Sequence, residues 1–114
     1  MSPPIVQPVL PVDDIGAGVG FYEHLGFDVD RFDSNYSIVG HSGHELFHLQ
    51  VNLDLDRDSN PTSMYLRVSD EDRWHERWKG AGVSVGEIAN RDWGMREFSL
   101  TDPAGNTLRV GTNL

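Results

Sequence analysis

Apolar and polar residues alternate most regularly in two short segments near the end of the chain. Residues 97–101 read Glu-Phe-Ser-Leu-Thr and residues 107–110 read Thr-Leu-Arg-Val, with the sequence Asp102-Pro-Ala-Gly-Asn106 between them. A period of two is typical of half-buried strands. Pro103 restricts φ at the start of a turn, and Gly105 accepts the φ that follows. The pattern therefore predicts a hairpin of two strands, Met95–Leu100 and Thr107–Val110.

The first half of the chain reads as a strand, a helix and three more strands. The predicted strands are Ile5–Val12, Phe27–Phe32, Tyr36–Val39 and Glu45–Val51, and the predicted helix runs from a cap at Asp13 or Asp14 to about Leu25. Gly26 follows this helix as its C′ residue. Three glycines within the helix each cost about 1 kcal/mol relative to alanine. Packing of its apolar stripe must therefore hold the helix together.

A polar connector, residues 53–62, leads into a second series of the same kind. The predicted elements are the strand Met64–Val68, a helix starting at Ser69, the strand Val83–Val85 and a loop or irregular strand over residues 87–92. Asp72 stands three residues after Ser69, which is a capping-box spacing. Trp74, Trp78 and Ala81 then follow at the spacing of a core-facing helical stripe, so we expect both tryptophans to serve packing.

An internal repeat relates the two series. Leu10-Pro-Val12-Asp-Asp14 matches Leu66-Arg-Val68-Ser-Asp70, and the interval from Val12 to Gly26 equals that from Val68 to Gly82. Several matches at identical spacing indicate a duplicated supersecondary unit. We therefore predict an α+β fold of paired βαβββ modules that form curved mixed sheets. The repeat units cover about residues 5–52 and 63–112 of a single domain, residues 1–114.

Composition argues against several classes of protein. The chain has 114 residues, 38% of them hydrophobic, which suits one globular domain. Its net charge of −9 repels phosphate backbones and argues against nucleic-acid binding. No apolar run approaches the roughly 20 residues of a membrane span, and we expect no signal segment. Because the chain contains no cysteine, disulfides and thiol chemistry are excluded, and the cytoplasm is the expected location.

The acidic surplus itself has two interpretations. It keeps the protein soluble, which is the ordinary role of such a surface, or it creates a negative potential that attracts a cationic ligand. Under the second interpretation a cationic antibiotic would be a suitable ligand, whereas an acidic metabolite would not.

Four motifs resemble those of a known superfamily. Val12-Asp-Asp14 and Phe21-Tyr-Glu-His-Leu-Gly-Phe27 are similar to the opening of vicinal oxygen chelate proteins, and Asp102-Pro-Ala-Gly-Asn106 to their other common signature. Trp93-Gly-Met-Arg-Glu-Phe98 resembles the last hairpin of bleomycin resistance proteins, in the glyoxalase/bleomycin resistance/dioxygenase superfamily. The resemblance extends over nearly the whole chain and implies the paired βαβββ fold. It leaves function open, because this superfamily includes isomerases, dioxygenases, thiol transferases and non-catalytic binders.

The resemblance also indicates where a metal would bind. Metal-dependent members place four His or Glu ligands on the cupped sheet, and the corresponding positions here are Gln7, His48, Ser63 and Arg109. Only His48 suits a divalent ion, and a guanidinium repels one. His41 and His44 flank a turn, where we expect them to face water. The sequence therefore predicts no metal site, no cofactor and no catalytic residues.

A metal-free binding site would use aromatic side chains. Trp93, next to Gly94, would offer a stacking face to a planar or cationic group, or would cover the core instead. Phe32 and Tyr36 flank a turn that contains Asp33. These side chains would close over a flat cation, or the two rings would form a cross-strand pair.

The central strand of the first half and the last hairpin add polar candidates. Alternation places His48 and Gln50 on one face and Phe47 on the other, and the first two are favoured. Arg96 and Glu97 also lie on opposite faces, so that one steers the ligand and the other faces solvent. The predicted ligand-binding residues are Trp93, Phe32, Asp33, Tyr36, His48, Gln50, Phe47 and Arg96.

These residues lead to three hypotheses about function. The first, which the resemblance implies, is a non-catalytic protein that sequesters a cationic, aromatic, bleomycin-like antibiotic. The second is a lyase or isomerase of a small metabolite with His48 as its base, with or without a metal, and the third is a small-molecule sensor. N-terminal arms cross between subunits in this family, and Pro3 and Pro4 suit an extended arm. We therefore expect a homodimer with exchanged arms.

Overall fold

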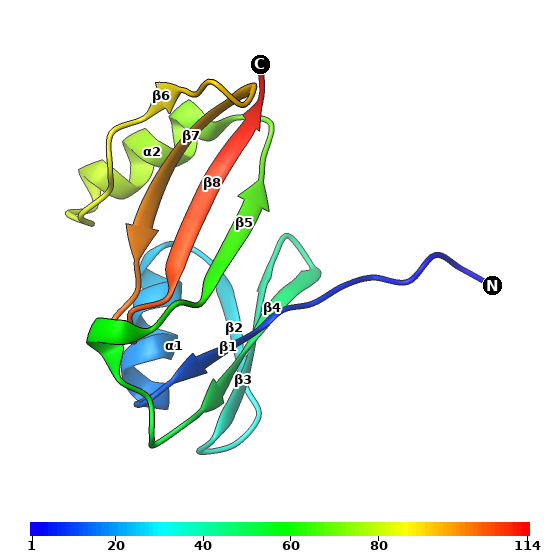
Figure 1. Cartoon of the computed structure of the whole chain (residues 1–114). Coiled ribbons are helices and arrows are strands. Elements are labelled where there is room, and N and C mark those ends of the chain that lie inside the picture. Colours follow the sequence, from blue (N-terminus) through cyan, green and yellow to red (C-terminus); the bar gives the residue numbers. More distant parts are fainter. The chain divides into compact units, whose positions relative to one another are not determined.

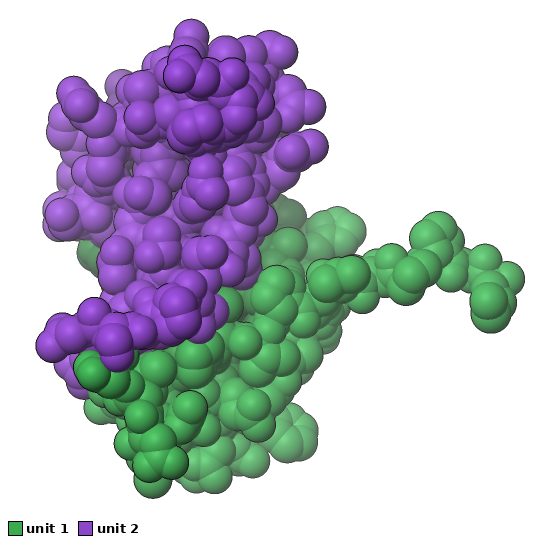
Figure 2. All heavy atoms as spheres, in the orientation of Figure 1, with its two compact units in different colours: residues 1–56 green, residues 57–114 purple.

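Two four-stranded sheets, each with one helix against it, make up the computed structural model, which describes residues 1–114 (Figure 1). The chain divides into two compact units, residues 1–56 and 57–114 (Figure 2). The division lies in the predicted connector. Each unit has the order strand, helix and three strands, so the predicted fold class is confirmed. That the units form a single domain stays a prediction. Neither helix is long and apolar enough to cross a membrane.

Unit 1, residues 1–56, is built around a sheet with the strand order β1-β4-β3-β2. Its elements are β1 Val9–Val12, α1 Ile15–His24, β2 Asp28–Arg31, β3 Tyr36–His41 and β4 His44–Val51. β1 runs parallel to β4, and the other neighbours are antiparallel. Tyr22 of α1 packs edge to face against Phe27 and Phe47, with ring centroids 6.2 and 5.1 Å away. These three buried rings form the core between α1 and the sheet.

Helix α1 approaches the sheet closely at one of its glycines. A Cβ on Gly18 would lie 3.3 Å from the side chains of both Val12 and Leu49. Because Gly18 has no side chain, the helix can pack closely against the sheet at this point. Asp14 caps the helix as predicted, because its carboxylate accepts a hydrogen bond from Ala17 N at 3.2 Å. The low helix propensity of this segment is thus offset by a cap and by close packing.

Unit 2, residues 57–114, repeats the arrangement with the strand order β5-β8-β7-β6. Its elements are a 3-10 turn Arg57–Ser59, β5 Ser63–Arg67, α2 Glu71–Gly80, β6 Ala89–Asn90, β7 Met95–Thr101 and β8 Thr107–Asn113. Trp78 of α2 packs edge to face on Phe98 of β7, with centroids 5.8 Å apart, and is fully buried. Trp74 packs against Trp78 at 5.4 Å. Both tryptophans thus pack as predicted.

The predicted turn between the last two strands is organised by one buried carboxylate. Asp102 Oδ1 accepts hydrogen bonds from Ala104 N and Asn106 N, both at 2.9 Å, and Oδ2 accepts one from Asn106 Nδ2 at 2.9 Å. Gly105 has a φ of 86°, which favours glycine. The turn sets the register of the hairpin, with Thr101 opposite Thr107.

Two strand predictions were wrong. β1 begins at Val9 instead of Ile5, because Pro8 and Pro4 lack the N–H that a strand ladder requires. Residues 83–85 form no strand. Gly86 N donates a 2.8 Å hydrogen bond to Ser99 O of β7, but the residues before it form no ladder, and the two-residue β6 is the edge strand instead.

Two predictions about α2 were also wrong. The helix is preceded by Asp70 as its N-cap, not Ser69, and no side chain caps it. The Asp70 carboxylate accepts from Trp74 Nε1 at 2.9 Å instead. Ala81 is exposed, because the helix ends at Gly80 and the chain then turns away from the core.

Candidate functional site

In each unit the helix covers one face of the sheet and leaves the other face open. In unit 1, Ser37, Val39, Phe47 and Leu49 are completely buried on the helix side. Because side chains alternate along a strand, Tyr36, Ile38, His48 and Gln50 lie on the opposite face. Most of the predicted ligand-binding residues of unit 1 belong to this open face or to the turn beside it.

A cavity of about 430 Å³ lies at the turn between β2 and β3. It is lined by Phe32, Asp33, Asn35, Tyr36, Ile38 and Gln50. Four of the predicted residues therefore meet around one space. Phe32 is 76% exposed, so its ring is open to a ligand. The turn itself is fixed by Asp33, whose Oδ1 accepts a hydrogen bond from Asn35 N at 2.8 Å.

His48 is held by hydrogen bonds at both ring nitrogens. The Tyr36 hydroxyl is hydrogen bonded to Nδ1, and Nε2 lies 2.7 Å from Gln7 Oε1. With the Gln7 oxygen as acceptor, Nε2 donates this hydrogen bond. The main chain of His48 also donates to Pro8 O at 2.8 Å. His48 therefore links the cavity residue Tyr36 to the start of β1.

Trp93 of unit 2 combines high exposure with a fixed position. Trp93 is 62% exposed, yet its Nε1 donates a hydrogen bond to Glu97 Oε1 at 2.6 Å. Arg109 Nη2 donates to the same oxygen at 3.0 Å. The Arg109 guanidinium carbon lies 5.9 Å from the Trp93 ring and 5.5 Å from the Tyr65 ring, within cation–π range. Four side chains from β5, β7, β8 and the loop before β7 thus form one cluster.

Glu97 is a buried, ionised group at the centre of this cluster, with 3% of its surface exposed. Burial raises the pKa of Glu97, but hydrogen bonds from Tyr65, Arg109 and Trp93 outweigh burial and hold this pKa below its usual value. Burial and the hydrogen bond to Glu97 raise the pKa of Tyr65. The second carboxylate oxygen, Oε2, is buried and has no hydrogen-bond partner. A cavity of about 200 Å³ lies here, lined by Arg91, Trp93, Glu97, Phe98, Ser99 and Arg109.

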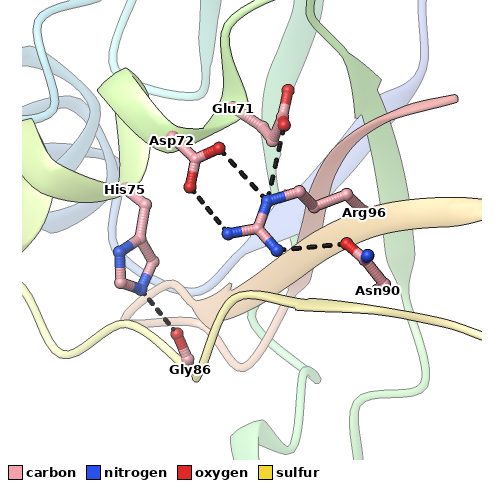
Figure 3. Close-up of polar contacts among 6 residues, drawn as sticks. All are labelled: Glu71, Asp72, His75, Gly86, Asn90 and Arg96. Atoms are coloured by element: carbon pink, nitrogen blue, oxygen red, sulfur yellow. Dashed lines mark hydrogen bonds and ion pairs between the residues drawn. The ribbon is translucent and has the colours of Figure 1, made fainter. Parts of the chain in front are cut away.

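Two of the predicted residues lie away from these cavities. Phe47 is in the core beneath α1, with none of its surface exposed. Arg96 points toward α2 and pairs with Asp72 at 2.9 and 3.1 Å, with Asn90 at 3.1 Å, and with Glu71 at 3.8 Å (Figure 3). Arg96 lowers the pKa of Asp72 through these hydrogen bonds. We therefore leave Phe47 and Arg96 out of the site.

The sequence interpretation did not include Tyr65, and it gave Arg109 and Glu97 no shared role. The signal was available in the hairpin register. With Thr101 opposite Thr107, Arg109 lies opposite Ser99 and Glu97 lies opposite Gly111. Glu97 and Arg109 are then diagonal neighbours on one face, and Tyr65 is the partner of Arg109 on β5.

The residues at the family's metal positions do not fit a divalent ion. Gln7 and His48 are hydrogen bonded to each other. Arg109, in the corresponding place of unit 2, brings a positive charge that is paired with Glu97. No group of three or more His, Cys, Asp or Glu side chains is arranged to hold a metal.

Comparison with known proteins identifies relatives of this fold. A model of the Glyoxalase/Bleomycin resistance protein/Dioxygenase superfamily matches residues 5–110. A bleomycin-binding protein in complex with bleomycin superposes with a TM-score of 0.89 at 24% identity, covering 98% of this chain and 100% of that one. A bleomycin resistance determinant encoded on transposon Tn5 gives 0.88 at 24% identity, covering 97% and 98%.

A third solved structure has a somewhat higher sequence identity. It is the bleomycin-binding protein from bleomycin-producing Streptomyces verticillus, complexed with copper(II)-bleomycin. It superposes with a TM-score of 0.83 at 27% identity and covers all of both chains. Comparison with curated protein sequences gave no match.

Proposed function

Because the chain belongs to the glyoxalase/bleomycin resistance protein/dioxygenase superfamily, we propose that it is a non-catalytic protein that binds and sequesters a cationic, aromatic, bleomycin-like antibiotic. The superfamily also contains enzymes, so membership alone does not select this function. Three features support the binder: fixed aromatic rings, an acidic surface, and structural relatives that bind bleomycin.

The observation that carries the proposal is the exposed but immobilised indole of Trp93. A hydrogen bond from Nε1 to the buried Glu97 fixes the ring while leaving 62% of the residue exposed. A ring that is already ordered loses little entropy when a planar group stacks on it, which favours tight binding. Phe32 offers a second exposed ring beside Asp33 in unit 1. Each ring offers a stacking face to a planar group of a ligand.

Charge supports the cationic character of the ligand. The net charge of −9 gives the protein a negative potential that attracts cations over a distance set by the salt concentration. Association should therefore become slower and weaker as salt is added. Asp33, at the rim of the unit 1 cavity, would add a local attraction.

We further propose that two chains form a homodimer by exchanging their N-terminal arms. Residues 1–8 belong to no strand and extend from unit 1 (Figure 1). Ile5 and Val6 are 82% and 85% exposed. Apolar side chains on an extended segment gain stability when a second subunit covers them. The arm is anchored at Gln7 and Pro8 by His48, so the residues before Gln7 would be exchanged.

The hydrogen bonds of His48 make a lyase or isomerase less favoured than a binding protein. Both ring nitrogens are engaged, one by Tyr36 and the other by Gln7. A general base needs a free nitrogen within reach of the proton that it removes. A substrate would have to displace one of these two partners before His48 could act.

The proposal is tested by titrating chelator-treated protein with bleomycin while tryptophan fluorescence is followed. Wild type should show saturable quenching that weakens with salt, and Trp93→Phe should lose most of it. Trp74→Phe is the matched control, because Trp74 packs on α2 against Trp78. Absence of quenching at high micromolar drug, or equal quenching in Trp93→Phe, would contradict the proposal.

A further inference from the structure

Arg109 lies where the cation of a ligand would bind well. Its guanidinium carbon is 5.5 Å from the Tyr65 ring and 5.9 Å from the Trp93 ring, and one nitrogen is 3.0 Å from Glu97 Oε1. Aromatic faces combined with a carboxylate are the groups with which proteins bind guanidinium and ammonium ligands. The chain thus provides both a cation site and a cation that fills it.

We propose that Trp93, Tyr65 and Glu97 form a binding site for the guanidinium or amidinium group of a ligand, and that Arg109 occupies this site until the ligand displaces it. This inference adds a contact for the ligand's cationic group, and it rests on the proposed function for the identity of the rest of the ligand. The binding of the cationic group can be tested separately.

The acidic part of this site is built into the strands of unit 2. Glu97 has 3% of its surface exposed and lies opposite Gly111. A Cβ on Gly111 would overlap the Tyr65 hydroxyl and lie 2.7 Å from Glu97 Cβ. Only glycine at this position lets the tyrosine and the glutamate approach each other. The strands of unit 2 themselves therefore place the Glu97 side chain beside Tyr65.

Arg109 matches this carboxylate incompletely. Its hydrogen bond goes to Oε1, which also accepts from Trp93, whereas the buried Oε2 has no partner. An unpaired buried acceptor is unfavourable. A guanidinium that is not attached to the backbone can donate two parallel N–H groups once the carboxylate turns so that both oxygens face it. The free oxygen thus favours replacement of Arg109 by such a group.

Arg109 can also leave at small cost. Its side chain is 44% exposed, so the guanidinium is already partly hydrated. Trp93 and Tyr65 are 62% and 36% exposed, which leaves their rings accessible from solvent. The adjoining cavity of about 200 Å³ has room for the atoms next to a ligand's cationic group. Displacement therefore exchanges one partly solvated cation for another.

The test uses methylguanidinium chloride as the probe, at constant ionic strength maintained with sodium chloride. The readout is the NMR chemical shift of the Trp93 indole N–H, which the Trp93→Phe spectrum assigns. Arg109→Ala removes the internal competitor, so half-saturation should occur at a concentration about tenfold lower than in wild type. Arg109→Ala combined with Glu97→Gln is the matched control and should show no saturable shift.

Several results would overturn the inference. These are equal half-saturation in wild type and Arg109→Ala, no saturation in either, or saturation that persists in the double variant. Equal binding of tetramethylammonium, which has no N–H group, would overturn the assignment to guanidinium. If Arg109→Ala does not fold, Arg109→Gln keeps a hydrogen-bond donor beside Glu97 and replaces it in the same comparison.

The outcomes for this inference and for the proposed function are distinguishable. Saturable methylguanidinium binding without bleomycin binding would retain the cation site and reject the antibiotic as ligand. Bleomycin binding that does not respond to Arg109→Ala, with no methylguanidinium effect, would retain the proposed function and reject the cation site.

Discussion

Glu97→Gln tests whether the buried carboxylate stabilises unit 2 by its charge. The substitution preserves shape and keeps an oxygen that can accept hydrogen bonds, but it removes the negative charge. Glu97 Oε1 accepts from Trp93 at 2.6 Å and from Arg109 at 3.0 Å. A hydrogen bond to a charged group contributes about 1.5–3 kcal/mol and a neutral one about 0.5–1.5 kcal/mol.

The expected loss is worked from the bonds of Trp93 and Arg109, and loss of the Tyr65 hydrogen bond to the carboxylate would add to it. Neutralising the acceptor of the Trp93 bond should cost about 1 kcal/mol. Arg109 is partly exposed, so its pair contributes about 1 kcal/mol or less. The free energy of unfolding of Glu97→Gln should therefore be about 2 kcal/mol lower than that of wild type at pH 7, roughly a thirtyfold change in the folded-to-unfolded ratio.

The loss should also depend on pH with a definite sign. Because the folded protein holds the pKa of Glu97 below its usual value, the unfolded chain takes up the proton first as the pH falls. The stabilisation is complete above the unfolded pKa of about 4.3 and disappears as the pH falls through the lower, folded value. The difference between wild type and Glu97→Gln should therefore shrink below pH 4.

Urea unfolding at one fixed protein concentration measures these differences, because association would otherwise change the apparent stability. Glu76→Gln, which removes an exposed carboxylate from α2, is the control and should change stability by less than about 0.5 kcal/mol. A loss in Glu97→Gln no larger than in the control would refute the reasoning. So would a loss of the same size at pH 7 and pH 3.5.

Three further predictions follow from burial and backbone geometry. Phe47→Ala should lower the free energy of unfolding by about 3–5 kcal/mol because the ring is fully buried. Phe32→Ala should leave the free energy of unfolding nearly unchanged and weaken bleomycin binding. Equal free energies of unfolding for the two variants would contradict this. Gly105→Ala should lower the melting temperature and cost more than about 1 kcal/mol, since its φ is 86°; an unchanged melting temperature would refute it. Ile5→Ser combined with Val6→Ser should reduce the dimer fraction in sedimentation velocity, and an unchanged fraction would exclude exchange of these residues.

Much of the fold was predictable because local patterns reflect it directly. The alternation in residues 44–51 separated Phe47 from His48 and Gln50, and the structure places them on opposite faces. The turn at residues 102–106 was recognisable because Pro103 and Gly105 suit a specific backbone geometry. The strand predicted at residues 83–85 failed because short apolar runs indicate burial without determining what pairs with them.

The cluster around Glu97 was harder to predict, since a period of two gives the face of a residue but not its burial. A glutamate in an alternating strand is ordinarily solvent-exposed. Its burial here depends on Gly111, on Tyr65 from a strand far earlier in the sequence, and on Trp93. Arg96 could not be placed either, because its partners Asp72 and Glu71 lie on α2.

The repeat of the βαβββ unit within one polypeptide has a consequence for symmetry. Two identical chains must present identical surfaces, so every substitution occurs in both. Here the two halves are covalently joined and have diverged at corresponding positions. His48 lies beside β1 and is hydrogen bonded to Tyr36 and Gln7, whereas Arg109 lies beside β5 in an ion pair. A single chain can thereby carry a histidine in one unit and an arginine at the corresponding place in the other, whereas two copies of one half would carry the same residue twice.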